Sequence, residues 1–279
     1  MNSIGIAEFL SYGFIQRALI AGSFIALICS LLGVILVLRR LSLIGDGLSH
    51  VTFGGVALGL FLNVYPLYVS LPLVVFSSLG ILRLADKARM YGDAAIGIVS
   101  SIGIAAGVML ASIGGGFNID LFSYLFGNIL SISEYEVASS IMLSLLVLAT
   151  IVFYFNEILS ITFDEEFARA SGINTGRINT LLVMLTGITV VLTMKVVGIM
   201  LTSALLILPA STAFQLARGF RNAMVIAAIT SVFSVIAGIT LSFMMDLPTG
   251  ASIVLLNAAF FLAAFTYAQR SRKPASPVR

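Results

Sequence analysis

Apolar stretches of about 20 residues follow one another through most of this 279-residue chain. A stretch of that length can cross the hydrocarbon core of a bilayer as a helix. Hydrophobic residues make up 59% of the chain and charged residues only 10%, whereas an ordinary soluble domain has about 25% charged residues. Such a composition cannot cover a globule with polar surface. The sequence therefore predicts an all-α fold, a polytopic transmembrane helical bundle that forms one domain over residues 1–279.

Turn-forming and helix-breaking residues separate the apolar stretches, notably at 63–66, 114–116 and 246–250. The count is eight to nine spans, because the division near Val196 depends on Lys195 marking a turn. Pro209 predicts a kink within its span. The predicted spans are 17–38, 43–62, 67–84, 94–113, 137–156, 179–195, 197–216, 223–245 and 250–268.

The spans also contain many small residues, which predict close packing between helices. They are Gly54, Gly55 and Gly59, then Gly97 with Ser100 and Ser101, and Gly103 with Gly107.

The connections between the spans alternate between two sides. Every Lys and Arg residue except Arg17 and Lys195 falls on one of these sides. By the positive-inside rule that side is cytoplasmic. Residues 1–16 are then an external segment, and 269–279 are a cytoplasmic tail. Because the basic residues lie at helix ends, where they set the orientation of the chain in the membrane, the net charge of +3 does not predict a nucleic-acid partner.

Two connections are too long to be simple turns. Residues 117–136, on the external side, contain an apolar segment too short to span, which predicts a re-entrant or surface-lying helix. Residues 157–178, on the cytoplasmic side, predict a short amphipathic helix between two spans. Asp164 is its expected N-cap, acidic residues fill its first turn, and Gly172 is expected to end it.

The connection after the first span leads into the most unusual residues. Arg39 and Arg40 precede Asp46 and His50, the only histidine in the chain. In a helix over 43–62, Asp46 and His50 lie one turn apart on the same face. An ionisable pair in a membrane segment costs several kcal/mol by most estimates, so it indicates a functional site. Imidazole and carboxylate both bind divalent transition metals, which makes the pair a candidate for metal ligands. The alternative is an Asp–His contact that only packs the bundle.

Five blocks of sequence carry a resemblance. The blocks occur in the same order as in the metal-ion permeases of zinc- and manganese-importing ATP-binding-cassette transporters, and the chain resembles this family over almost its whole length. One departure is Gly47, where members of that family often carry alanine. The blocks are 37–50 with 53–59, 125–130, 163–165 with 168–172, 205–213 and 248–255.

The resemblance implies a homodimer akin to the cobalamin-importer architecture, in the plasma or inner membrane of a prokaryote. It implies separate ATPase subunits on the cytoplasmic side and an external solute-binding protein that delivers the metal. Zn²⁺ is the favoured cargo and Mn²⁺ a close second, with iron not excluded and no permanently bound cofactor. A dimer would bring two Asp46 and two His50 side chains together as a four-coordinate ring. The residues expected to dock the ATPase are Phe163, Asp164, Glu165, Glu166, Ala168, Arg169 and Gly172.

The sequence contains no G-x-x-x-x-G-K-[ST] loop, so it predicts no ATPase activity in this chain. The main alternative is a secondary metal transporter driven by an ion gradient. That class needs coupling acids on several helices and often shows inverted repeats, whereas Asp46 is the one acid placed firmly within a span. A metalloprotease needs His-Glu-x-x-His, which one histidine cannot supply. A purely structural subunit would leave Asp46 and His50 without a role. The single Cys29 excludes a disulfide within the chain, and 1–16 lacks the basic region of a cleavable signal peptide.

Overall fold

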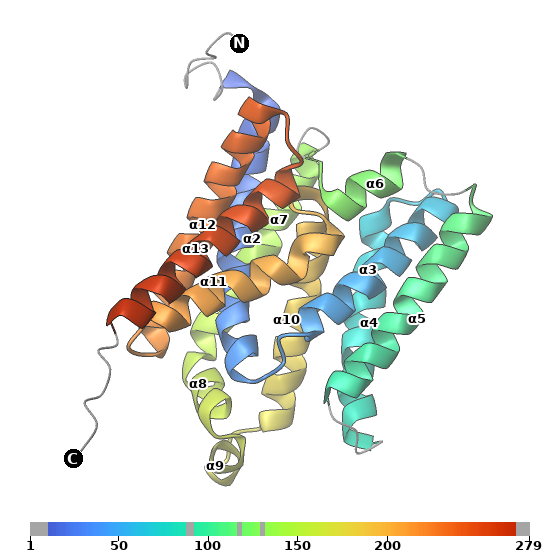
Figure 1. Cartoon of the computed structure of the whole chain (residues 1–279). Coiled ribbons are helices and arrows are strands. Elements are labelled where there is room, and N and C mark those ends of the chain that lie inside the picture. Colours follow the sequence, from blue (N-terminus) through green and yellow to red (C-terminus); the bar gives the residue numbers. More distant parts are fainter. Residues whose placement is uncertain (1–10, 88–91, 116–118, 129–131, 272–279) are drawn as a thin grey trace.

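The computed structural model describes residues 11–87, 92–115, 119–128 and 132–271, and over these residues it contains helices and no strands. The predicted all-α fold is confirmed. In chain order the elements, shown in Figure 1, are α2 (Gly13–Leu38), α3 (Ile44–Phe61), α4 (Pro66–Lys87), α5 (Gly92–Ile113), α6 (Ile119–Phe126), α7 (Glu134–Phe153), α8 (Phe155–Phe163), α9 (Glu165–Ala170), α10 (Thr175–Val196), the 3₁₀ turn η2 (Ile199–Leu201), α11 (Thr202–Leu216), α12 (Phe220–Met245) and α13 (Thr249–Ser271).

A helix occupies each of the predicted spans. Within the described residues, seven helices are long and apolar enough to cross a membrane: α2, α4, α5, α7, α10, α12 and α13. The other two, α3 and α11, are shorter, with 18 and 15 residues. Several helices begin before the predicted boundary. For example, α10 begins at Thr175 and includes Arg177, because a helix continues into the polar residues at the membrane surface.

Three boundaries are informative. The division between α10 and α11 falls at Gly198, whose φ of 94° only glycine adopts without strain. The predicted span 137–156 was wrong at its end, because α7 stops at Phe153 and the chain turns at Tyr154 into α8. Pro209 does not end α11, which continues through it to Leu216.

The two ends of the bundle differ in the way that the charge pattern predicts. The start of α2 and the short helix α6 lie at one end, and α9 lies at the other (Figure 1). The basic ends of α2, α4, α10 and α12 lie on the side of α9. Residues 1–10 of the external segment, 272–279 of the tail, and 129–130 of the second sequence block lie outside the described residues.

The short helix in the predicted external segment is α6, which packs on the bundle through Leu121, Tyr124 and Leu125. After it, Ser133 and Glu136 form a capping box that starts α7. The Tyr65 hydroxyl donates a hydrogen bond to Glu136. Burial raises the pKa of Tyr65, and the bond to Glu136 raises it further. This contact ties the loop before α4 to the start of α7.

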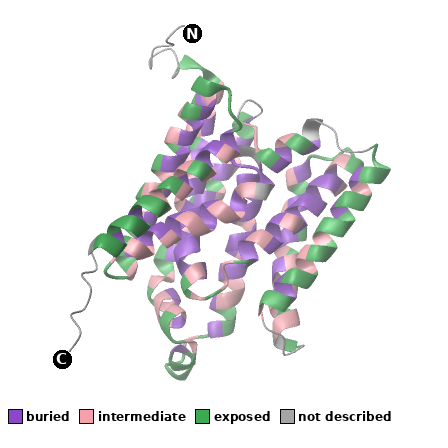
Figure 2. Cartoon of the chain, in the orientation of Figure 1, coloured by how far each residue is buried: buried purple, intermediate pink, exposed green. Residues whose placement is uncertain are grey.

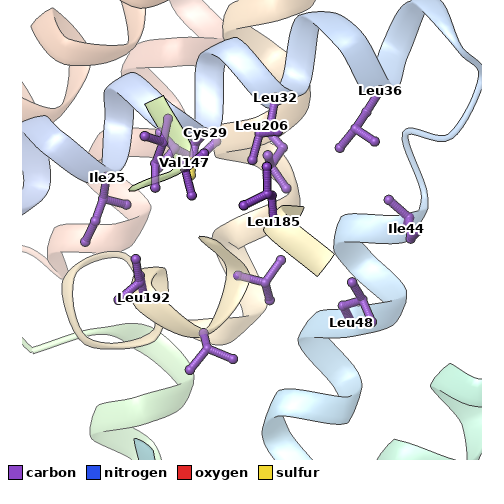
Figure 3. Packing of buried hydrophobic residues seen from close by; sticks show 14 of the residues in the cluster. Ile25, Cys29, Leu32, Leu36, Ile44, Leu48, Val147, Leu185, Leu192 and Leu206 are labelled. Carbon is purple, nitrogen blue, oxygen red and sulfur yellow. The ribbon is translucent and has the colours of Figure 1, made fainter. Parts of the chain in front are cut away.

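The centre of the bundle is formed by α2 and α10. In an 18-residue apolar stretch of each helix, 72% of the residues are buried in α2 and 67% in α10. The corresponding value for α5 is 17%, so α5 lies at the periphery. Figure 2 shows the buried residues concentrated in the middle of the molecule. In Figure 3, Cys29 and Leu32 of α2 lie among Leu185 and Leu192 of α10 and Leu206 of α11. Peripheral helices keep apolar side chains on their outer faces, where a bilayer is the matching solvent.

Glycines allow the closest helix contacts, as the small residues predict. A Cβ added at Gly54 would lie 2.9 Å from the backbone oxygen of Gly103, so α3 and α5 approach backbone to backbone. A Cβ at Gly33 would lie 2.0 Å from the backbone oxygen of Leu206, which brings α2 equally close to α11. Gly97 has no heavy atom within 4 Å of such a Cβ and takes no part in these contacts.

Replacing Gly33 by alanine should lower the thermal stability of the protein in detergent. The added methyl group would force α2 and α11 apart, and overpacking of this kind costs about 1–3 kcal/mol. Gly97→Ala is the matched control, because its methyl group meets open space and alanine favours the helix. Equal unfolding midpoints for the two variants would contradict the tight α2–α11 contact.

Candidate functional site

The turn between α2 and α3 sets the position of the candidate metal ligands. Arg40 adopts a left-handed φ of 58°. Its N–H donates to the Val37 oxygen, and the Leu41 N–H donates to the Leu36 oxygen at 2.8 Å, which is the hydrogen-bond pattern of a Schellman cap. The chain reverses there, and α3 begins at Ile44 with Asp46 in its first turn. A carboxylate at that place interacts favourably with the positive end of the helix macrodipole.

Asp46 and His50 are the open positions of an otherwise enclosed helix segment. Between Ile44 and Ala57, every residue except these two is buried. The Asp46 side chain is 49% exposed and the His50 side chain 21%. The prediction that the two share one face of a helix is confirmed by geometry, since His50 Nε2 lies 3.5 Å from Asp46 Oδ2.

That distance suits two ligands of one metal ion. Two ligand atoms at about 2.1 Å from a tetrahedral ion are about 3.4 Å apart. His50 Nδ1 is enclosed and has no hydrogen-bond partner among the described residues, whereas Nε2 faces the carboxylate. Nε2 is therefore the nitrogen placed to share an ion with Asp46.

One chain does not complete a metal site. Over the residues that the structure describes, no group of three or more His, Cys, Asp and Glu side chains gathers at one place. Two ligands are too few for tight binding of Zn²⁺, which takes three or four from the protein.

The short helix α9 begins and ends as predicted. The Asp164 side chain accepts a hydrogen bond from the Phe167 N–H at 2.9 Å, which makes it the N-cap. Gly172 follows the C-cap residue Ser171 with a left-handed φ of 87°, and its N–H donates to the Arg169 oxygen. The helix itself is only six residues long, from Glu165 to Ala170.

The predicted docking residues of α9 do not all face outward. Phe163, Asp164, Glu166, Arg169 and Gly172 are exposed, whereas Ala168 is completely buried and holds α9 against the bundle. Phe167 was missing from the prediction, although it is 67% exposed and lies four residues after Phe163. The signal that could have found it is a large apolar residue in a helix of only six residues, which has little area against which to bury it.

Glu165 was predicted to be exposed to a partner, but it is only partly exposed and bonds to residues of the bundle. Its Oε2 lies 3.0 Å from Arg39 Nη2, and its Oε1 accepts a hydrogen bond of 2.9 Å from Asn179 Nδ2. Arg169 lies 3.6 Å away on the same helix. The side chain of Glu165 is 37% exposed and that of Arg39 only 9%. Glu165 thus joins α9 to Arg39 at the end of α2. Arg39 lies seven residues before Asp46 in the chain.

The five sequence blocks converge on two places. The first, third and fourth meet near the α2–α3 turn, where Glu165 bonds to Arg39 and Leu206 packs against Gly45. The second and fifth meet at the α10–α11 turn, where Gly198 and Gly250 both approach the backbone of Phe126.

Residues 11–268 match the family model described as the ABC 3 transport family. The chain belongs to this family. MntC, a manganese transport system membrane protein of Halalkalibacterium halodurans, is 33% identical over 263 residues, which are 94% of this chain and 90% of the relative. ZnuB, a high-affinity zinc uptake system membrane protein of Haemophilus influenzae, is 34% identical over 245 residues, 88% of this chain and 94% of the relative.

A solved structure has a similar fold. PsaBC from Streptococcus pneumoniae, in complex with Fab, matches with a TM-score of 0.84 and 29% identity, over 96% of this chain and 100% of that chain. The resemblance to metal-ion permeases of ATP-binding-cassette transporters is confirmed, and the chain is a multi-pass protein of a prokaryotic membrane.

Proposed function

We propose that this chain is the permease subunit of an ATP-binding-cassette importer that moves a divalent transition-metal ion into the cytoplasm. The observation that carries the proposal is the placement of Asp46 and His50. They are the two residues left open between Ile44 and Ala57, and their ligand atoms lie 3.5 Å apart. An ionisable pair held in that way within a membrane helix has a role in binding.

The site needs a second copy of the chain. One chain offers two ligands, and a homodimer with its two-fold axis along the pathway would offer two aspartates and two histidines. The partial exposure of both side chains supports this arrangement, because a surface that awaits a partner must remain open in the single chain.

Energy for transport comes from separate ATPase subunits that bind α9. Phe163, Phe167 and Glu166 are exposed on and beside this helix at the arginine-rich end of the bundle. Exposed aromatic side chains are typical anchors of protein interfaces. An external solute-binding protein would deliver the ion to the opposite end, near α6.

The ligand set suits Zn²⁺ best, with Mn²⁺ a close second. Four aspartate and histidine ligands match the tetrahedral geometry of zinc, while the carboxylates also suit manganese. The relatives named for zinc and for manganese are similarly identical to this chain, at 34% and 33%, so identity does not separate the two metals.

The test is uptake by the assembled complex in sealed vesicles. The permease, its ATPase and its binding protein are reconstituted, and entry of radiolabelled zinc and manganese is measured with and without ATP. We expect uptake that requires ATP and favours zinc. Uptake that runs on a proton or sodium gradient without ATP would instead establish the secondary transporter.

A further inference from the structure

A cavity of about 610 Å³ opens at the arginine-rich end of the bundle, between α4, α9 and the start of α10. Its lining has two chemically different parts. Leu79, Leu82 and Met184 form an apolar part, while Arg83, Arg169 and Arg177 form a basic part. This cavity is separate from Asp46 and His50, neither of which lines it.

Among the described residues that line the cavity, positive charges outnumber negative ones. One carboxylate, Glu165, lines the cavity beside the three arginines, and it already bonds to Arg39. Across the described part of the chain, neither Arg83 nor Arg177 has a salt bridge within 4.0 Å. Glu157 lines a neighbouring cavity that Arg177 also borders, but no salt bridge joins these two described residues. A ligand with negative charge would supply the missing partners.

The basic part lies near the ends of the helices, and the apolar part lies deeper in the membrane-spanning segments. Leu79 lies one turn before Arg83 on α4, toward the middle of the span, and Arg83 lies one turn before Lys87 at the end of the helix. On α10, Arg177 is in the first turn and Met184 is two turns deeper. The cavity therefore changes from charged to apolar over about 10 Å along the helix axes.

We propose that this cavity binds an anionic phospholipid, with its phosphate between Arg83 and Arg177 and its acyl chains along Leu79, Leu82 and Met184. Basic pockets between membrane helices on the cytoplasmic side suit such headgroups, and guanidinium groups hold phosphate with paired hydrogen bonds. The bound lipid would also contact Arg169, and so α9. The proposal depends on the chain lying in a membrane and not on which ion it carries.

Native mass spectrometry of the purified full-length protein tests the proposal. The protein is stripped of lipid and offered phosphatidylglycerol or phosphatidylcholine in equal amounts. We expect phosphatidylglycerol to bind at least about tenfold better. Arg83→Gln with Arg177→Gln should weaken its binding about thirtyfold, as expected for the loss of two cationic contacts. Arg83→Lys with Arg177→Lys should retain most of the binding, because the charge remains.

Arg218→Gln is the matched control, since Arg218 is exposed at the same end and lies outside the cavity. It should leave phosphatidylglycerol binding unchanged. Equal binding of the two lipids by the wild-type protein would overturn the proposal, and so would undiminished binding by the double glutamine variant. Displacement of the lipid by equimolar inorganic phosphate would assign the site to a soluble anion, and displacement by the added ATPase would assign it to the partner protein. Either result would overturn the lipid proposal.

Discussion

Replacing Asp46 by alanine should reduce ATP-driven metal uptake at least about 100-fold while leaving the assembled complex intact. In a dimer the substitution removes two of the four ligands, and even the loss of an outer contact to a metal ligand commonly costs 10–100-fold. His50→Ala should have the same effect for the same reason. Both side chains are partly exposed in a helix whose other faces are packed, so neither substitution opens a cavity in the core.

Asp93→Ala is the matched control for this experiment. Asp93 lies in the first turn of α5, at the same end of the bundle as Asp46, and is exposed. It is also an aspartate in the first turn of its helix, but no histidine lies one turn away. Uptake should persist in this variant. Normal uptake by the Asp46 or the His50 variant, or equal loss in all three, would refute the assignment of the pair as metal ligands.

The sequence predicted the parts of the fold that depend on local pattern. Long apolar runs located a helix in each predicted span, and the one-turn separation of Asp46 and His50 placed them on one helix face. The ends of α9 were predictable for the same reason, because Asp164 and Gly172 act on backbone groups only a few residues away. The capping box of Ser133 and Glu136 is also a local signal and could have been predicted, although it was not.

Contacts between distant segments could not be predicted in this way. Arg39 and Glu165 are 126 residues apart, and Tyr65 and Glu136 are 71 apart. A single sequence shows only that each residue is polar, so Glu165 was taken for an exposed residue like its neighbour Glu166. Ala168 was likewise assigned to the docking surface, although its small side chain is what allows α9 to lie against the bundle. The basic cavity combines residues of three helices and has no sequence signature.

The contact between Arg39 and Glu165 leads to the second large effect. Arg39 is enclosed, and burial lowers the pKa of its guanidinium while Glu165 opposes that shift. Arg39 ends α2, and the turn that follows it positions Asp46. If α9 docks the ATPase as proposed, a movement of this helix would reach the proposed metal ligands through one hydrogen-bonded ion pair and one short turn. Coupling between the two sites requires that this connection have two arrangements, each favoured by a different state of the ATPase.

Glu165→Lys should uncouple the two activities. It places a second positive charge beside Arg39, so α9 loses its attachment to α2 while Ala168 and the helix caps remain. We expect transported metal per ATP hydrolysed to fall about tenfold, within the range typical of coupling between sites, while hydrolysis by the reconstituted complex continues. The measurement is simultaneous release of phosphate and uptake of labelled metal in the same vesicles.

A charge exchange separates coupling from docking. Arg39→Glu combined with Glu165→Arg restores the ion pair with reversed polarity and should recover most of the lost coupling, whereas either single change should not. Glu166→Lys is the control, because Glu166 is exposed on the same helix and has no salt bridge among the described residues. If it disturbs docking, it should lower hydrolysis and transport together. Full coupling in the Glu165→Lys variant, or no recovery in the exchanged pair, would mean that α9 acts on the metal ligands by another route.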